Sequence, residues 1–522
     1  MEVNICGMYN WAESIWKDCL WNGYKFNKNE IELYEILPAT VFDSLIASAK
    51  EVTKYRRNIL QLQSLSVLFS AWNNRFTRLQ KIELLPVNFV QSIKKEGKHK
   101  RFILSSPGDP LTEKEALDVF SAKDIVNIEY YRGLLDEKPK ELMGCSVDQL
   151  MNTWLVIMSL SKASSNNYYN NNVKNPNSLL SYAPTYEMKE LSNLVVDCTG
   201  LQYSDAQSLL KYLTFNGKRT QTLWTQPLIN LVNGSISILS YQANPLYVME
   251  RWLSQLSLDV SKKGSPFEDY VRKYISDSKK SDIINNYFMV LMKGFNFNPG
   301  IKSERKEQID LIFILGKIVF IGEIKCSIVP TEPTDYFNNR EIIKGAVSQA
   351  KRKSSCAKRF PKEFRRKLAQ SGIKIPEDFI IEPIVIVNSA IHSGYPIDNV
   401  PVVDLLIIER YLEGRLVERA MTSPDGKVKE EYVLSLYENI DSAQDNFVNY
   451  LNSPPQLRHI KNNVRPREIN FPLKMIDPSF PDIRYISYET YVDLDEVIAF
   501  QKIEAETKKA SKEQSLTLPT IV

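Results

Sequence analysis

Histidine and cysteine are scarce in this chain of 522 residues. The three histidines (His99, His392 and His459) lie far apart, and the six cysteines include no C-x-x-C pair. A zinc site is therefore not expected. Scattered cysteines without a regular spacing indicate a reduced, intracellular environment.

The sequence also lacks long apolar runs, a large net charge and a signal peptide. No uninterrupted apolar segment approaches the roughly 20 residues that span a bilayer, and Met1-Glu2-Val3-Asn4 has no basic start. A cytoplasmic protein that does not contact membranes is therefore expected. Because the net charge is only +4, any affinity for polyanions must come from local clusters of basic residues.

The chain is too long for one ordinary hydrophobic core, so two or three domains are expected. We predict a mostly α-helical N-terminal region over residues 1–260, divided into two parts near the asparagine-rich loop 164–178. A second domain is predicted over residues 261–440. An extension of helices and proline-bearing loops with a frayed tail is predicted over residues 441–522.

The N-terminal region has secondary-structure signals but no chemical motif. Apolar periodicity predicts helices over 38–49 and 59–72. Ser146-Val147-Asp148-Gln149 is a capping-box pattern that opens a helix to Leu160, and Asn233-Gly234 predicts a hairpin turn. Without a nucleophile, a phosphate-binding glycine loop or a metal-ligand cluster, this region is expected to serve targeting or assembly, through a partner protein or a second copy.

Three tryptophans, Trp11, Trp16 and Trp21, lie near the start of the chain. A stripe of this kind could bind a base or a peptide. Packing into a hydrophobic core is the favoured interpretation.

The most informative stretch is residues 307–326, where two β-rich runs flank Gly316-Lys317. Glycine in the first position of a two-residue loop is typical of a type II′ hairpin turn. With that turn Leu315 pairs with Ile318. Both faces of the hairpin are apolar, which predicts a strand pair buried on both sides.

Counting outward from the turn places Asp310 directly opposite Glu323, and period-2 alternation adds Lys325 to the same face. Two carboxylates about 5 Å apart repel by about 3 kcal/mol at an effective dielectric of about 20. A divalent cation between them removes that repulsion, and carboxylate oxygens are ligands that Mg²⁺ prefers. The pair therefore predicts a site.

The elements around the hairpin predict an α/β layer. A helix is expected from Ser265, with proline in its first turn, and another over Arg340–Ala357. Two further strands are expected over Pro383–Asn388 and Val400–Ile408. This order indicates a mixed sheet flanked by helices.

The order of Glu268, Asp310, Glu323-Ile324-Lys325 and Gln349 resembles the PD-(D/E)XK nuclease superfamily. Its restriction-endonuclease-like core is shared by Mrr-type enzymes, lambda exonuclease and junction resolvases. The resemblance covers roughly residues 264–415. An E-x-K triplet alone is common in charged proteins, but the buried strand, the paired aspartate and the flanking helices make the match more specific. Ile309 stands where the name motif has proline, a position that varies in the superfamily.

The resemblance implies a restriction-endonuclease-like α/β core with Mg²⁺ or Mn²⁺ as cofactor. Asp310, Glu323 and the backbone carbonyl of Ile324 would bind the metal, and Lys325 would orient the attacking water and stabilise charge developing on phosphorus. A lysine that only neutralises two acids is the alternative. Glu268 matches an optional glutamate of the opening helix, although Ser265 and Glu268 also form a capping-box pattern. Gln349 matches a glutamine that faces the metal, although a surface position is the alternative.

Ten basic residues and one acid, Glu363, lie between Lys344 and Lys367. Such a run is usually a solvated face, but beside a phosphodiesterase-like site it predicts binding to a nucleic-acid backbone. The first six of these residues are Lys344, Lys351, Arg352, Lys353, Lys358 and Arg359.

The function predicted is therefore a metal-dependent nuclease that acts on double-stranded DNA, and the resemblance implies a bacterial restriction or phage-defence role. The rival is a non-catalytic nucleic-acid-binding or assembly subunit that keeps the fold. A third alternative, a chance motif in a structural protein, predicts that Asp310 and Glu323 lie far apart.

Overall fold

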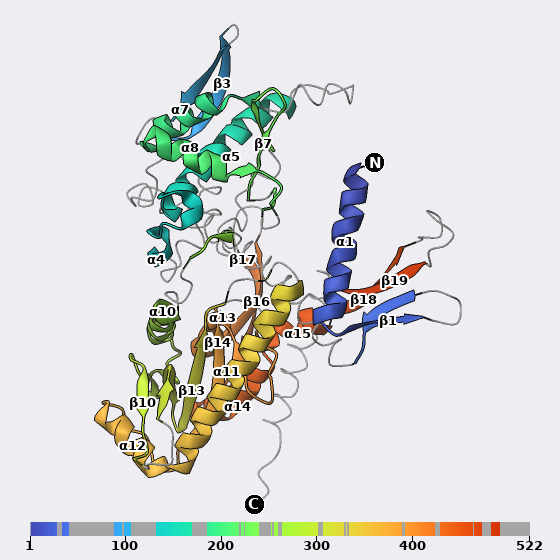
Figure 1. Cartoon of the computed structure of the whole chain (residues 1–522). Coiled ribbons are helices and arrows are strands. Elements are labelled where there is room, and N and C mark those ends of the chain that lie inside the picture. Colours follow the sequence, from blue (N-terminus) through green and yellow to red (C-terminus); the bar gives the residue numbers. More distant parts are fainter. Residues whose placement is uncertain are drawn as a thin grey trace, which may run out of the picture. The chain divides into compact units, whose positions relative to one another are not determined.

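The structure is a computed structural model of the chain (Figure 1). It describes residues 2–28, 34–40, 88–96, 99–105, 132–169, 185–218, 221–223, 225–239, 252, 255–258, 264–300, 306–327, 330, 333–388, 392–422, 428–462, 464–471 and 482–490. The chain divides into two compact units. One is Leu62–Pro266, and the other combines Met1–Gln61 with Phe267–Val522.

The larger unit is built on a mixed five-stranded sheet of order β15-β14-β13-β12-β9. Its strands are β9 (Phe288–Val290), β12 (Leu311–Leu315), β13 (Ile318–Lys325), β14 (Ile380–Val387) and β15 (Val402–Val403). β13, β14 and β15 are parallel, whereas β12 is antiparallel to both β13 and β9. The predicted α/β class with a mixed sheet is confirmed.

The hairpin of β12 and β13 has the predicted register, with Leu315 paired to Ile318. Gly316 adopts a φ of 58°, which a glycine accepts without steric cost. The amide of Lys317 donates to Oε1 of Gln444 at 2.7 Å. The turn therefore sets the pairing of every residue outward to the acidic end.

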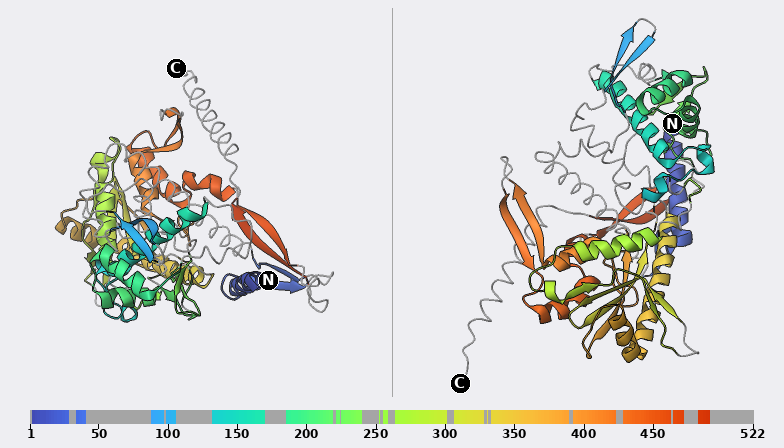
Figure 2. Two further views of the ribbon diagram at one scale, coloured as in Figure 1. Left: turned by 90° about the horizontal axis from the view of Figure 1, so that it is seen from above. Right: turned by 90° about the vertical axis from the view of Figure 1, so that its left-hand side faces the viewer.

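Helices cover both faces of this sheet. α11 (Pro333–Arg359) and α12 (Pro361–Gln370) pack on the face of Ile312, Val319 and Ile321, and α11 lies along the strands in Figures 1 and 2. On the opposite face Phe313 and Phe320 stack with ring centroids 4.6 Å apart.

The cover of that opposite face comes from α13 (Leu405–Glu413) and α14 (Ile440–Asn452). The ring centroid of Phe320 lies 5.0 Å from that of Phe447 in α14, and Phe447 stacks on Tyr411 of α13 at 4.2 Å. The hairpin is therefore buried on both sides, as predicted.

The prediction of a strand over Val400–Ile408 is wrong beyond Val403. Asp404 is the N-cap of α13, where its carboxylate accepts a hydrogen bond from the amide of Ile407 at 3.2 Å. The apolar run that follows recurs at helical spacing, with Ile408, Tyr411 and Leu412 buried. The run that we interpreted as extended is thus the buried face of a helix.

Four further elements lie between residues 264 and 309, outside the five-stranded sheet. They are α10 (Gly264–Asp277), the 3₁₀ turn η5 (Asn285–Tyr287), β10 (Phe295–Phe297) and β11 (Glu307–Ile309). β11 pairs with β10 in a separate two-stranded sheet. Asp310 is the bend at which the chain leaves β11 and enters β12.

The two ends of the described chain meet in a second, four-stranded sheet of order β1-β2-β19-β18. Its strands are β1 (Tyr24–Lys28), β2 (Tyr34–Pro38), β18 (Val464–Phe471) and β19 (Ile483–Thr490). β2 and β19 are parallel, and Figure 1 shows the blue N-terminal strands beside the red ones. This pairing removes Met1–Gln61 from the N-terminal region in which we had placed it.

We predicted that the extension over 441–522 consists of helices and loops. That prediction is wrong in part, because the extension also contains strands. It holds β18 and β19 after α14 and α15 (Pro455–Asn462), and the ribbon of β16 (Arg415–Thr422) and β17 (Val428–Ser435) comes before it. Alternation in β18 and β19 is weak because few of their side chains are buried. The apolar pattern that identifies a strand was therefore missing.

Two of the three tryptophans contradict the prediction of core packing. They lie on α1 (Glu2–Trp21), where Trp16 is 64% exposed and Trp21 is 39% exposed. Trp21 contacts Phe337 of α11, with ring centroids 5.2 Å apart. The side chain of Trp11 lies outside the described residues.

The smaller unit, Leu62–Pro266, combines helices with short strands. Its helical elements are α4 (Arg132–Leu135), the 3₁₀ turn η2 (Lys140–Leu142), α5 (Val147–Tyr169), α7 (Met188–Thr199) and α8 (Tyr203–Tyr212). Its strands are β3 (Val90–Glu96), β4 (His99–Leu104), β5 (Thr185–Tyr186), β6 (Thr214–Phe215), β7 (Leu228–Asn230) and β8 (Ile236–Ile238).

Two local predictions in this unit are confirmed. Ser146 and Gln149 form the reciprocal hydrogen bonds of a capping box, at 2.7 and 3.2 Å, and β7 pairs with β8 as a hairpin. α5 continues nine residues beyond the expected end at Leu160, into the predicted loop. The helix over 59–72, most of that over 38–49, residues 170–178 and the frayed tail lie outside the described residues.

None of the helices that the structure describes is both long enough and apolar enough to span a membrane.

Candidate active site

Asp310 and Glu323 meet at one end of the hairpin, and both are buried, at 8% and 2% exposure. Oδ2 of Asp310 accepts a hydrogen bond from the amide of Ile324 at 3.2 Å. That bond fixes the aspartate against β13 beside Glu323. The two acids therefore lie together, as the register predicted, and not far apart, as the chance-motif alternative predicted.

Two lysines neutralise this acidic pair. Nζ of Lys325 lies 2.7 Å from Oε1 of Glu323 and 3.3 Å from Oε1 of Gln349. Nζ of Lys353 lies 3.3 Å from Oδ1 of Asp310 and also donates to Oε2 of Glu323. Two ammonium groups thus balance the two carboxylates, and Gln349 faces the site rather than the surface.

Lys353 is the residue whose role the sequence did not disclose. We predicted it on an exposed phosphate-binding face, but it is only 5% exposed, so that assignment is wrong. In α11 it shares one face with Ala346, Ala350 and Ala357, which are all buried. The spacing from Gln349 could have indicated this role. Lys353 lies four residues after Gln349, and residues at that spacing are neighbours on one face of a helix.

A buried arginine joins α10 to the site. Nη1 of Arg272 donates to the backbone carbonyl of Asp310 at 2.5 Å, and Nη2 donates to Oδ1 of Asp269 at 2.6 Å. Arg272 lies four residues after Glu268, whose Oε2 is 3.8 Å from Nη1. No motif or spacing in the sequence distinguishes this arginine from the many other charged residues.

Glu268 lies near enough to the acidic pair for their charges to act on its carboxyl. Burial and the charges of Asp310 and Glu323 raise the pKa of its carboxyl, against the opposing effect of Arg272. α10 begins at Gly264, so Ser265 lies within the helix rather than at its N-cap. The capping-box alternative for Glu268 therefore loses its geometric basis.

Replacing Glu268 by glutamine is expected to stabilise the metal-free protein at neutral pH. A carboxyl with a raised pKa in the folded state contributes stability that is fully present below its ordinary value and is lost as pH rises through the folded-state pKa. Glutamine cannot ionise and avoids that loss. Thermal unfolding in EDTA should give a higher midpoint than wild type at about pH 7.5 and an equal one at about pH 4.

Glu341→Gln is the control with the opposite sign. A hydrogen bond from Lys344 lowers the pKa of Glu341, so its ionised form stabilises the fold above the ordinary carboxyl value and that stability is lost as pH falls. A Glu268→Gln variant that is less stable than wild type at neutral pH would contradict the assignment.

The predicted basic run forms an exposed face of α11. Lys344, Lys351, Arg352, Lys358 and Arg359 carry exposed or half-exposed side chains. Three of them have acidic neighbours: Lys344 pairs with Glu341 at 2.8 Å, Lys351 lies 3.5 Å from Asp398, and Arg352 pairs with the buried Glu307 at 2.7 Å. Arg352 therefore also has a structural role.

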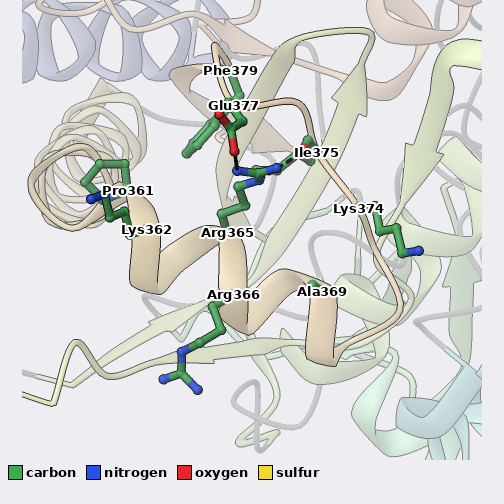
Figure 3. Close-up of a pocket in the computed structure, with 9 residues that line it drawn as sticks. All are labelled: Pro361, Lys362, Arg365, Arg366, Ala369, Lys374, Ile375, Glu377 and Phe379. Carbon is green, nitrogen blue, oxygen red and sulfur yellow. Dashed lines mark hydrogen bonds and ion pairs between the residues drawn. The ribbon is translucent and has the colours of Figure 1, made fainter.

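A cavity of about 660 Å³ continues the basic surface onto α12. It is lined by four basic residues and one acid, Lys362, Arg365, Arg366, Lys374 and Glu377, together with apolar side chains that include Phe379. Figure 3 shows Arg365 and Glu377 pointing toward one another, with Nη1 2.5 Å from Oε1, whereas Arg366 and Lys374 point away from that pair. The lining of the cavity therefore carries a net positive charge.

The acidic pair fits a divalent cation in donor chemistry. Two buried carboxylates each give an oxygen to the single ammonium of Lys353, which shows that a cation can be shared between them. Among the described residues, no group of three or more His, Cys, Asp or Glu side chains has metal-binding geometry. Mg²⁺ commonly uses only one or two carboxylates together with water and substrate phosphate.

Comparison with known proteins gave no match. No protein-family model matches the chain, and no curated protein or solved structure shows significant similarity to it.

Proposed function

We propose that this protein is a metal-dependent nuclease that hydrolyses phosphodiester bonds in double-stranded DNA, and that its larger unit holds a restriction-endonuclease-like core. The observation that supports the proposal most directly is the cluster of Asp310, Glu323 and Lys325 at the end of a buried hairpin, with Gln349 beside it. Buried acids beside a lysine, with a glutamate of raised pKa on a nearby helix, are typical of catalytic sites.

Asp310 and Glu323, with the carbonyl of Ile324, would hold Mg²⁺ or Mn²⁺. The bound metal would polarise the scissile phosphate and lower the pKa of a bound water. Lys325, held by Glu323 and Gln349, is positioned to orient that water and to stabilise charge developing on the phosphate. Glu268 would add a negative charge that favours the bound cation.

The basic face of α11 and the cavity of α12 would bind the DNA backbone. Phe379 lines the cavity and precedes Ile380, which pairs with Ile318, whereas Glu323 pairs with Val385. Five residues of strand correspond to about 16 Å, or the rise of about five base pairs. The basic surface therefore extends well beyond the acidic pair.

The test is a cleavage assay with purified protein. Plasmid and linear double-stranded DNA, single-stranded DNA and RNA are incubated with Mg²⁺, with Mn²⁺ or with EDTA. Cleavage of duplex DNA that requires the metal is expected. Absence of cleavage under every condition would overturn the proposal.

Reversing two charges on the basic face should weaken DNA binding in a salt-dependent way. Each phosphate contact contributes a slope of about 0.9 in a plot of log affinity against log salt concentration. For Lys358→Glu with Arg359→Glu we therefore expect a slope smaller by about 2, measured by fluorescence anisotropy in EDTA. Lys189→Glu with Lys211→Glu makes the same charge change at exposed positions of α7 and α8 and should leave the slope unchanged.

The rival function, a nucleic-acid-binding subunit without catalysis, has one observation in its favour. Lys325 and Lys353 neutralise both acids, so the pair is electrostatically satisfied without a metal. This rival predicts salt-sensitive DNA binding that is indifferent to Mg²⁺ and Mn²⁺, with no cleavage. The metal dependence of binding and cleavage therefore separates the two functions.

A further inference from the structure

The position of Lys353 has a consequence for how the site is controlled. Its Nζ is the only cationic centre described that contacts both acids: Oδ1 of Asp310 and Oε2 of Glu323 converge on it. Of the two acids, Lys325 contacts only Glu323, through Oε1. Lys353 thus lies between the two carboxylates, whereas Lys325 lies to one side.

A metal ion that bridged the same two carboxylates would need the same space. Mg²⁺ binds carboxylate oxygens at about 2.0–2.1 Å, which places the ion between Asp310 and Glu323, where the ammonium of Lys353 lies. An ammonium and a divalent cation in that same space would overlap and repel each other. The ammonium of Lys353 must therefore move away when a metal ion binds.

We infer that Lys353 and a divalent cation are alternative occupants of the Asp310–Glu323 pair, so that Lys353 acts as a built-in counter-ion that the metal must displace. This inference rests on the proposed function, because it describes regulation of that same site. Lysine suits the role, since its charge lies on a flexible four-carbon stem that can swing aside.

The net charge of the cluster determines when replacement of Lys353 by a metal ion is favourable. Two carboxylates and two lysines are neutral together, and replacement of the Lys353 ammonium by a divalent cation leaves the cluster with one positive charge in excess. An anionic phosphodiester and its neighbours offset that excess, so DNA favours the metal-bound arrangement. The free protein should therefore bind metal weakly, and DNA should strengthen metal binding.

The experiment that tests this inference measures metal binding rather than cleavage. Titration calorimetry with MnCl₂ in the absence of DNA compares wild type with Lys353→Met, and Lys293→Met, at an exposed position of the same unit outside the basic face, is the matched control. If Lys353 has left the two acids in a tenth or less of the free protein, removing this competing side chain raises the apparent affinity for Mn²⁺ about tenfold or more. We expect that gain for Lys353→Met and wild-type affinity for Lys293→Met.

Wild-type protein gives a second measurement that does not depend on the folding of a variant. Acylation of lysine amines, followed by mass spectrometry, reports whether Lys353 is accessible. We expect its labelling to rise when Mn²⁺ is added, while that of Lys351 stays constant. An unchanged reactivity of Lys353, or a folded Lys353→Met variant that binds Mn²⁺ no more tightly than wild type, would overturn the inference.

These outcomes are distinguishable from failure of the proposed function. Metal-dependent cleavage by the wild type, with no gain in affinity for Lys353→Met, removes only the counter-ion role. Absence of both metal binding and cleavage removes the inference and the nuclease proposal together.

Discussion

Lys325→Met is expected to lower the rate of DNA cleavage by about 10²- to 10³-fold, the loss typical of removing one group that stabilises charge in a transition state. Its ammonium is partly exposed and lies between Glu323 and Gln349. Single-turnover cleavage of a labelled duplex in Mg²⁺ measures the loss.

The fold of this variant should survive. Glu323 keeps its contact with Lys353, so removal of Lys325 leaves no buried carboxylate unpaired. Circular dichroism and thermal unfolding check this point. Lys293→Met removes a lysine from an exposed position of the same unit and should cleave at the wild-type rate.

Asp310→Asn is also expected to lower the rate of DNA cleavage, but by weakening metal binding rather than by removing the lysine. The amide keeps the size of the side chain but loses the charge that a divalent cation requires, so cleavage should fall at least as far. Asp282→Asn, at an exposed position, is the control. Cleavage by Lys325→Met and Asp310→Asn at the wild-type rate would show that the acidic cluster is not the active site.

Arg272→Leu is the second change with a large expected effect, on stability and on cleavage together. Its buried guanidinium donates to the backbone carbonyl of Asp310. Removal of a hydrogen bond from a charged donor costs about 1.5–3 kcal/mol and leaves that carbonyl without its partner. The peptide that carries Asp310 also loses its link to α10.

Urea unfolding measures the loss of stability, and cleavage at a temperature where the variant is folded measures the loss of activity. Arg272→Lys keeps the charge but not the two-pronged donor geometry, so it should recover only part of both. Lys273→Leu removes the neighbouring exposed charge and should be close to neutral. A fully stable and active Arg272→Leu variant would show that α10 does not position Asp310.

Much of the candidate site could be predicted because its signals are local. Gly316-Lys317 sets the turn, and the turn sets the register that pairs Leu311 with Gly322. One step outward, Asp310 and Glu323 lie together, with Lys325 beside Glu323. The capping box at Ser146 is confirmed for the same reason, since its two hydrogen bonds join residues three apart in the sequence. In each case a few adjacent residues decide the geometry.

Local signals failed where another element competed with them. The apolar run after Val400 suits a strand or the buried face of a helix, and the N-cap at Asp404 together with packing against α14 favours the helix. Trp16 is a large aromatic residue of the kind usually found in a core, yet its side chain on α1 is exposed. Composition alone does not reveal which face of a helix another element covers.

The sequence by itself determined the hairpin, its acidic pair and the nearby lysine, because turn chemistry and period-2 alternation act over a few residues. Only the tertiary structure decided that Lys353 lies between the two acids, that Arg272 holds the carbonyl of Asp310, and that strands from the two ends of the described chain pair in one sheet. Those contacts join residues about 30 to 450 positions apart in the sequence. They form only when the elements pack, because buried polar and charged groups must then be paired with one another.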